Sequence, residues 1–363
     1  MNHAINSVIE TLANSEINKN KSKYPYFTDK RYTSHILDIN NFNEIQSHTH
    51  NHTIAAVDGG NIEIISAPNF SLSLIRVAAN TYKNNKKIKL PFDNIMTFLC
   101  LTTSAIDQNK NIIYTTNLFP LNQKHEEFSK KIKTFEFNSF DPTISSNQKK
   151  ADLTTMGSVT RCFLEWLLLE KLTDTLTNND IIIKDGSLQT RIIGENKYSD
   201  PLFTKAMKKN IIVCGLSKTT TLLTDTAASL AEEITNLSKN TNHKTWVYHP
   251  VCDIEHQNHK AEMYFVKLNE NSKHTFRFEI LKNQKQYANT TINAIAKNSN
   301  DISFPGYPYA LIDVDRLARV RYNEIEHYRV LFMASAAKNP IRNKILTSVS
   351  SINAHGILDR MIK

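Results

Sequence analysis

Apolar residues recur along the chain in two different periods, and the period indicates where strands and helices lie. Short apolar runs at residues 53–57, 62–66 and 71–79 predict three strands that form an antiparallel meander, and residues 98–105 predict another strand. From residue 151 to about 177 the apolar side chains return every three or four positions, as on one face of a helix. A strand-rich first part is therefore followed by a helix.

After this helix, strands and helices alternate. Apolar runs at residues 180–184 and 211–214 predict two short strands joined by a helix near residues 201–209, and such a connection favours parallel strands. The remaining predicted elements are a helix at 224–239, strands at 245–249, 261–268 and 275–281, the last two as a hairpin, and a mostly helical segment from 284 onward. The expected fold is α/β, with a mixed sheet (an antiparallel meander plus parallel strands) flanked by helices, an extra β-hairpin and C-terminal helices.

Glycine is rare, and three of the eight glycines stand just after an aspartate that follows an apolar run. Gly59 and Gly60 follow Asp58, and Gly186 follows Asp185. Glycine allows a sharp turn of the backbone and the close approach of a ligand. Each aspartate is expected to end a strand, and the two carboxylates then meet at one edge of the sheet. Because Asp-Gly is also a common hairpin turn, two ordinary turns are the alternative.

A third carboxylate stands on the predicted helix between these strands. Glu165 follows Arg161 by four residues and shares the apolar stripe of the helix. It is either an ion-pair partner of Arg161 or a third oxygen ligand beside the two aspartates, and Glu170 is the other candidate on this helix. Three clustered carboxylates repel one another, so such a group favours Mg²⁺ or Mn²⁺. Two such ions support the hydrolysis of a phosphodiester.

The composition limits the class of protein. Hydrophobic residues make up 40% of the chain and charged residues 22%, which is typical of a globular protein and excludes wholesale disorder. No apolar run is long enough for a membrane helix, and residues 1–10 show no signal-peptide pattern. The four cysteines are too few and too scattered for a disulfide framework. We therefore expect a soluble, cytoplasmic protein that has no membrane partner.

The net charge of +9 is by itself a weak indication of a polyanionic partner. Asn, Lys and Ile are abundant throughout, and a bias of the coding sequence toward A and T explains this equally well. The charge gains weight because the carboxylates provide a reason for a polyanion to be held nearby.

Six motifs follow one another along the chain, and their order is more specific than any single motif. They are Val57-Asp58-Gly59-Gly60, Arg161-x-x-x-Glu165, Ile183-Lys184-Asp185-Gly186-Ser187-Leu188, Gly215-Leu216-Ser217-Lys218, Phe276-Arg277-Phe278-Glu279, and the run from Gly306 to Ala318 with Tyr307 and Asp315. In this order the chain resembles a ribonuclease-H-like nuclease and, more narrowly, the NurA nuclease family, from about residue 50 to 335.

The resemblance implies an activity, a cofactor and partners. NurA nucleases process DNA ends together with HerA, a hexameric ATP-driven translocase. A similar chain is expected to be a deoxyribonuclease that cuts single-stranded DNA as an endonuclease and degrades duplexes as a 5′–3′ exonuclease. The implied cofactor is Mn²⁺ or Mg²⁺, as two ions, and the implied assembly is a homodimer. The predicted segments are a helical, polar extension at residues 1–45, the nuclease domain at 46–335 and a C-terminal helix at 336–363.

The same resemblance assigns roles to residues at matching positions. The implied metal ligands are Asp58, Glu165 and Asp185, and the further catalytic residues are Tyr307 and Asp315. Tyr307 matches a tyrosine of the active site, although an aromatic residue that anchors a loop is the alternative. Asp315 stands where some members have a histidine near the metals. It is a ligand, an acid paired with Arg316 or Arg319, or neither.

Cations near these motifs are candidates for binding substrate. Lys218 follows a predicted strand end, where a lysine can face a phosphate, and a solvated loop lysine is the alternative. The threonines after Lys218 are typical of a P-loop, but the glycines that a P-loop needs are missing. We also assign Arg161 and Arg316 to substrate binding.

A second metal site is compatible with the spacing of four residues, namely His249, Cys252, His256 and His259. The acidic and amide residues between them make a polar loop between strands an equally natural interpretation. The resemblance requires no zinc here.

Two other functional classes share part of this pattern. Actin-like and sugar-kinase-type ATPases also place two Asp-Gly turns around nucleotide phosphates, but they need more glycine and usually a duplicated domain. A non-catalytic subunit that binds DNA or assists assembly is the other alternative. The presence of both Asp58 and Asp185 argues against it.

Overall fold

The computed structural model describes residues 2–17, 22–46, 51–146 and 149–336. Within them the chain forms two compact units. The first unit contains residues up to 50, 185–189 and 212–309, and the second contains residues 51–184, 190–211 and those from 310 onward. The predicted C-terminal helix, beyond residue 336, lies outside the described residues. The three predicted segments remain predictions.

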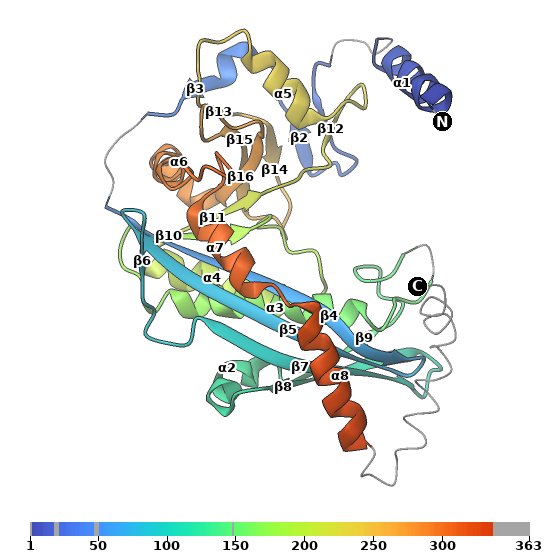
Figure 1. Ribbon diagram of the computed structural model, residues 1–363. Coiled ribbons are helices and arrows are strands. Elements are labelled where there is room, and N and C mark those ends of the chain that lie inside the picture. Colours follow the sequence, from blue (N-terminus) through green and yellow to red (C-terminus); the bar gives the residue numbers. More distant parts are fainter. Residues whose placement is uncertain (1, 18–21, 47–50, 147–148, 337–363) are drawn as a thin grey trace. The chain divides into compact units, whose positions relative to one another are not determined.

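The second unit contains the long strands of the protein (Figure 1). The paired order is β10 (Ile181–Asp185), β4 (Thr53–Ala67), β5 (Phe70–Lys83), β7 (Ile95–Ile106), β8 (Ile112–Pro120) and β9 (Thr134–Asn138), with β6 (Lys86–Ile88) beside β5. From β4 to β9 every pair is antiparallel, whereas β10 runs parallel to β4. The predicted mixed sheet is confirmed here, and it contains three strands that we did not predict, β6, β8 and β9.

Helices pack on this sheet because each presents an apolar face to it. Helix α3 (Thr155–Leu172) lies against β4, β5 and α4 (Asn196–Lys208), and its Trp166 and Leu168 are fully buried. Helix α8 (Tyr322–Ala336) packs on β4 through a cluster that includes Ile325 and Ile64. Helix α7 (Tyr309–Ala318) precedes α8, and the short α2 (Glu126–Ser129) lies beside β8.

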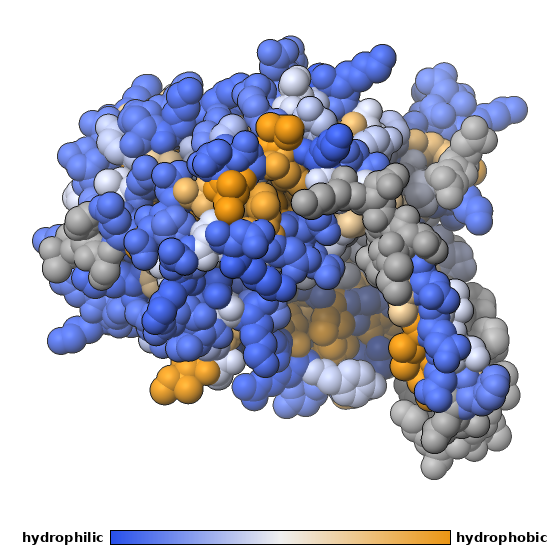
Figure 2. Space-filling view, turned by 90° about the horizontal axis from the view of Figure 1, so that it is seen from above, coloured by the Kyte–Doolittle hydropathy of each residue, from blue (hydrophilic) through white to orange (hydrophobic). Residues whose placement is uncertain are grey.

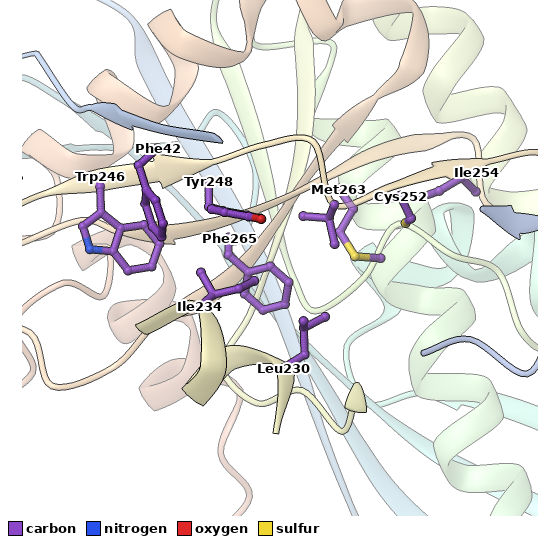
Figure 3. Packing of buried hydrophobic residues seen from close by; sticks show 10 residues of the cluster. Phe42, Leu230, Ile234, Trp246, Tyr248, Cys252, Ile254, Met263 and Phe265 are labelled. Carbon is purple, nitrogen blue, oxygen red and sulfur yellow. The ribbon is translucent and has the colours of Figure 1, made fainter. Parts of the chain in front are cut away.

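The first unit is built on antiparallel strands. Their order is β3 (Phe42–Glu44), β13 (Trp246–Tyr248), β15 (Ala261–Lys267), β16 (Phe276–Leu281) and β11 (Ile212–Ser217). The predicted hairpin is the pair β15–β16. Helix α5 (Leu230–Ser238) points Leu230 and Ile234 at Phe265 and Met263 of this sheet, next to a group of aromatic rings (Figure 3). Ser229 caps α5, because its side chain accepts a hydrogen bond from the N–H of Glu232.

Short elements complete the described chain. They are α1 (Asn2–Ile17), β1 (Pro25–Tyr26), β2 (Tyr32–Ser34), β12 (Leu223–Thr224), β14 (Cys252–Ile254), α6 (Ala288–Lys297) and 3₁₀ turns at Ile39–Asn41, Gln123–His125, Lys130–Ile132 and Lys282–Tyr287. Two small antiparallel pairs form between β1 and β12 and between β2 and β14.

One predicted turn is wrong. The pattern predicted that a strand ends at Asp58 and that residues 62–66 form another strand, but β4 continues from residue 53 to 67 without a break. Because Gly59 and Gly60 have no side chain, they instead leave room for neighbouring helices to pack against the strand. A Cβ at Gly59 would lie 2.7 Å from the Arg161 side chain, and a Cβ at Gly60 would lie 2.4 Å from the carbonyl oxygen of Ala318. Glycine is needed at both positions because helices approach the strand there, not because the chain turns.

The visible surface is mostly hydrophilic, with apolar residues in small separate groups (Figure 2). Among the described residues, none of the helices combines the length and the apolar character needed to cross a membrane.

Candidate metal centre

Two aspartates come together because their strands pair in a fixed register. In the parallel pair β4–β10, Lys184 lies opposite Val57, and Asp185 and Asp58 are the next residues on the two strands. One carboxylate oxygen of Asp58, one of Asp185 and one of Asp315 all lie within 4.8 Å of one another. All three side chains are half-buried, and within the described residues this group is the one whose donors suit a metal ion.

Asp185 is held by two side chains, one at each carboxylate oxygen. The hydroxyl of Tyr307 donates to Oδ1 over 3.2 Å, and the ammonium of Lys218 lies 2.8 Å from Oδ2. Tyr307 is fully buried, stacks on Phe304 and lies under the Lys218 ammonium, 5.3 Å from ring centroid to nitrogen. Tyr307 therefore anchors its loop and contacts Asp185, so the two interpretations of this residue are compatible.

The turn after Asp185 requires a glycine. Gly186 has φ +97°, a conformation that other residues adopt at a cost, and its N–H donates to the carbonyl of Leu216 on β11 over 2.9 Å. The prediction of a turn at this second Asp-Gly pair is confirmed. The strand stops at Asp185, which leaves its carboxylate at the edge.

Asp315 reaches the group from helix α7, and that helix is anchored on strand β5. The side-chain amide of Asn80 donates to the carbonyl of Ala310 and to the carboxylate of Asp313, 2.9 Å in each case. The ammonium of Lys87 lies 2.6 Å from the same Asp313 oxygen. Asp315 itself forms an exposed ion pair with Arg319, one turn later, at 3.2 Å. It is thus both an acid paired with Arg319 and a member of the carboxylate group.

Glu165 lies on the other face of β4. Side chains alternate along a strand, so Gly59 and Asp58 face opposite sides. Gly59 contacts Arg161 and Glu165 of α3, whereas Gly60, which shares the face of Asp58, contacts α7. The Glu165 carboxylate is buried, pairs with Arg161 at 2.6 Å and lies 3.8 Å from the ammonium of Lys184. The ion pair expected from the spacing is present, and the role of Glu165 as a metal ligand remains a prediction.

Arg161 interacts electrostatically with carboxylates on both faces of β4, namely Glu165 and Asp58. The Glu165 carboxylate raises the pKa of its guanidinium, burial opposes this, and Asp58 raises it further. Arg161 also donates to the carbonyl of Gly59 over 3.2 Å. The Arg161 guanidinium therefore stays positively charged at neutral pH.

Comparison with known proteins agrees with the fold and with the order of the motifs. The family model described as NurA domain matches residues 52–320, which is most of the chain. The chain belongs to the NurA family. The crystal structure of the NurA nuclease from Sulfolobus solfataricus superposes with a TM-score of 0.51 at 14% identity, over 92% of this chain and 95% of that one. At this identity the match shows the shared fold, which confirms the predicted class.

More distant structures add nothing to this. Two Argonaute structures from Aquifex aeolicus give TM-scores of 0.32 and 0.29 at 9% identity, and the match covers 73% and 74% of this chain and 28% of the Argonaute chain in each case. None of the curated proteins matches.

The donor set of this NurA chain fits a hard divalent cation. Three carboxylates within 4.8 Å of one another repel unless positive charge lies between or beside them. Oxygen donors of this kind suit Mg²⁺ and Mn²⁺ better than soft metals. Lys218 and Arg161 supply part of the compensating charge. Both residues are also predicted, from the sequence, to bind substrate. The third such candidate, Arg316, is exposed on α7.

The other acidic and metal-binding candidates of the NurA domain have other partners. Glu170 pairs with Lys131 at 3.0 Å. His249 pairs with Glu262 at 3.1 Å, and His259 lies 3.1 Å from Glu279. Within the described residues, His249, Cys252, His256 and His259 do not form a metal-binding group.

Sequence reasoning missed the residues that support the carboxylates. Asp313 stands two positions before Asp315 and fixes α7, and the spacing Asp-x-Asp in the last motif was the available signal. Glu279 was quoted as part of a motif but received no role.

Proposed function

We propose that this chain is a metal-dependent deoxyribonuclease that hydrolyses phosphodiester bonds, with Mn²⁺ or Mg²⁺ as cofactor. The observation that carries the proposal is the gathering of Asp58, Asp185 and Asp315 within 4.8 Å in a chain of the NurA family. The solved relative with the same fold is a nuclease. A divalent ion bound there would activate a water molecule and stabilise the leaving oxygen.

Each residue around the group has a task in this proposal. Asp58, Asp185 and Asp315 hold the ions. The family resemblance also assigns Glu165 to them, and this carboxylate lies across β4 from the group, in its ion pair with Arg161. Tyr307 orients Asp185 through its hydroxyl.

Two cations complete the site. Lys218 neutralises the second oxygen of Asp185 and is the nearest candidate for a substrate phosphate. Arg161 keeps positive charge beside Asp58.

The finer features of the proposal rest on family membership. We propose an endonuclease activity on single strands and a 5′–3′ exonuclease activity on duplex ends, in a homodimer that works with a HerA-type translocase and processes DNA ends. The net charge of +9 supports a DNA partner in general but selects none of these features.

The test compares cleavage of labelled single- and double-stranded DNA in EDTA, Mg²⁺ and Mn²⁺ for four proteins. We expect wild type to cleave with Mn²⁺ or Mg²⁺, and Asp58→Ala and Asp185→Ala to lose at least about a hundredfold in rate while they still fold and bind DNA. Asp174→Ala is the matched control, because this aspartate is exposed and paired with Lys205, and it should cleave normally.

Three results would contradict the proposal. Full activity in either site variant would falsify the assignment of the carboxylates. Hydrolysis of ATP by the wild-type chain without DNA cleavage would favour the kinase-like alternative, and DNA binding without either reaction would favour a non-catalytic subunit.

A further inference from the structure

A second carboxylate, away from the proposed metal group, is completely buried. Glu279 lies on β16 and is 1% exposed. It belongs to the motif Phe276-Arg277-Phe278-Glu279, to which the proposed reaction gives no task. Burying a carboxylate costs several kcal/mol unless it is paired and hydrogen-bonded, so its partners indicate what it stabilises.

The Glu279 carboxylate binds the segment that directly follows Asp185. The hydroxyl of Ser187 donates to it over 3.1 Å, and the N–H of Leu188 donates to the same oxygen over 2.8 Å. The Arg277 guanidinium, 3.2 Å away, compensates its charge, and Nε2 of His259 lies 3.1 Å from it.

These contacts continue into a chain of hydrogen bonds that returns to His259, beside Glu279. The N–H of Gln189 donates to the hydroxyl of Ser187 over 2.9 Å, and its side-chain amide donates to the hydroxyl of Tyr32 over 3.2 Å. Tyr32 is hydrogen-bonded to Nδ1 of His259 at 2.9 Å, and Nε2 of His259 faces Glu279. Residues 187–189 are thus fixed at several points to two other segments of the same unit.

We propose that Glu279 is a positioning residue for Asp185. The inference rests on the proposed function, because it gives these contacts a task in metal binding. Asp185 ends a strand, Gly186 makes the turn, and the next two residues are bound to Glu279. A metal ligand must be held within a fraction of an ångström, and groups that fix its surroundings commonly change metal affinity 10- to 100-fold.

A purely structural ion pair explains the geometry less well. Apolar residues of similar size stabilise a core about as well as a buried ion pair does. The feature that apolar residues cannot replace is the pair of hydrogen bonds from Ser187 and from the backbone of Leu188. Both constrain the chain within three residues of Asp185.

The experiment uses the full chain with three substitutions. Glu279→Gln changes the carboxylate, and Ser187→Ala removes one hydroxyl without leaving a buried charge, so it guards against a misfolded first variant. Glu262→Gln is the matched control, because Glu262 lies on the adjacent strand β15 and pairs with His249 but has no bond to residues 186–189 in the described contacts. The readouts are Mn²⁺ binding by calorimetry, and amide hydrogen exchange of residues 185–189 without metal.

We expect the Mn²⁺ dissociation constant to rise about 10- to 100-fold in Glu279→Gln and about 3- to 10-fold in Ser187→Ala, with residues 185–189 exchanging faster. Glu262→Gln should match wild type in both. Unchanged exchange, or unchanged Mn²⁺ affinity in a folded variant, overturns the inference. If the wild-type chain neither binds Mn²⁺ nor cleaves DNA, the proposed function fails, and the exchange data alone then decide whether Glu279 fixes Asp185.

Discussion

Removing the hydroxyl of Tyr307 separates the structural role of this residue from a functional one. Tyr307→Phe keeps the ring that stacks on Phe304 and lies under Lys218, but it removes the bond to Asp185. We expect the free energy of unfolding to fall by about 1 kcal/mol and Mn²⁺-dependent cleavage to fall about tenfold. Urea unfolding and a cleavage assay measure these effects.

The control for Tyr307 is Tyr114→Phe. Tyr114, on β8, is equally buried, and its hydroxyl donates to the carbonyl of Ala151. This variant should lose similar stability and retain its cleavage rate. Equal rates in both variants would show that the Tyr307 hydroxyl serves packing alone.

Asp315 provides a second test at the level of one side chain. Because it belongs to the carboxylate group, Asp315→Ala should weaken Mn²⁺ binding at least about tenfold. Arg319→Ala removes the partner of Asp315 in an exposed ion pair, which contributes at most about 1 kcal/mol, and should leave binding unchanged. Calorimetric titration with Mn²⁺ distinguishes the two. Equally weak binding in both variants would mean that Asp315 acts only through its ion pair, and normal binding in Asp315→Ala would exclude it as a ligand.

For single residues, the sequence identified most members of the candidate site but not the face of the sheet on which each one lies. Asp58, Asp185 and Tyr307 were named from motifs and meet as expected. The spacing Arg161-x-x-x-Glu165 correctly predicted an ion pair on α3. Which face of the sheet α3 covers depends on contacts far apart in the chain, so the sequence could not tell that Asp315, rather than Glu165, stands with the two aspartates.

At the scale of elements, the position of helix α7 depends on the absence of a side chain at Gly60. In Gly60→Ala the new Cβ would lie 2.4 Å from the backbone of Ala318, so α7 must shift. We expect the free energy of unfolding to fall by about 1–3 kcal/mol and cleavage to fall more than tenfold, because Asp315 moves with the helix. Thermal unfolding and cleavage rates measure both.

Gly194→Ala separates the loss of stability from the shift of α7. Gly194 has φ +76° with no atom within 4 Å of a Cβ, so alanine there costs about 1 kcal/mol through backbone strain alone. This variant should cleave DNA normally. An equally large loss of cleavage in both variants would mean that general destabilisation, not the position of α7, lowers the activity.

The same glycines show why a local rule failed. Asp-Gly is a frequent turn signal, and Asp185-Gly186 obeys it. Asp58-Gly59-Gly60 does not, because helices on both faces of β4 come too close for side chains. A glycine required by a neighbour and a glycine required by a turn look alike in a single sequence.

For the molecule as a whole, ionisation of the buried Glu279 makes the free energy of unfolding depend on pH in acid. Burial raises the pKa of its carboxyl, but Arg277 and then His259 outweigh this and lower it from 4.5 to about 2. Between these two values the unfolded chain binds the proton and the folded chain does not. The free energy of unfolding is therefore higher above pH 4.5, and about 3 kcal/mol of it is lost as the pH falls toward 2.

Urea unfolding from pH 6 to 2.5 tests this. Glu279→Gln cannot bind that proton, so its stability should be lower at pH 6 and should approach that of wild type as the pH falls. Parallel pH curves for the two proteins would show that other groups determine the acid transition.

The general architecture was predictable because the apolar periods of strands and helices are local. The mixed sheet, the hairpin and the helices at the end follow from them. The two compact units were not predictable, since the chain passes between them several times, once between Lys184 and Asp185 within a single strand, where composition does not change.

The carboxylate group joins residues from nearly opposite ends of the chain, and this has a consequence for synthesis. Asp58 and Asp185 are made long before Asp315, and α7 is among the last described elements to leave the ribosome. A growing chain therefore carries an incomplete group until its final part is translated. On the proposed function, a fragment that stops short of α7 would lack one carboxylate of the group and should not cleave DNA.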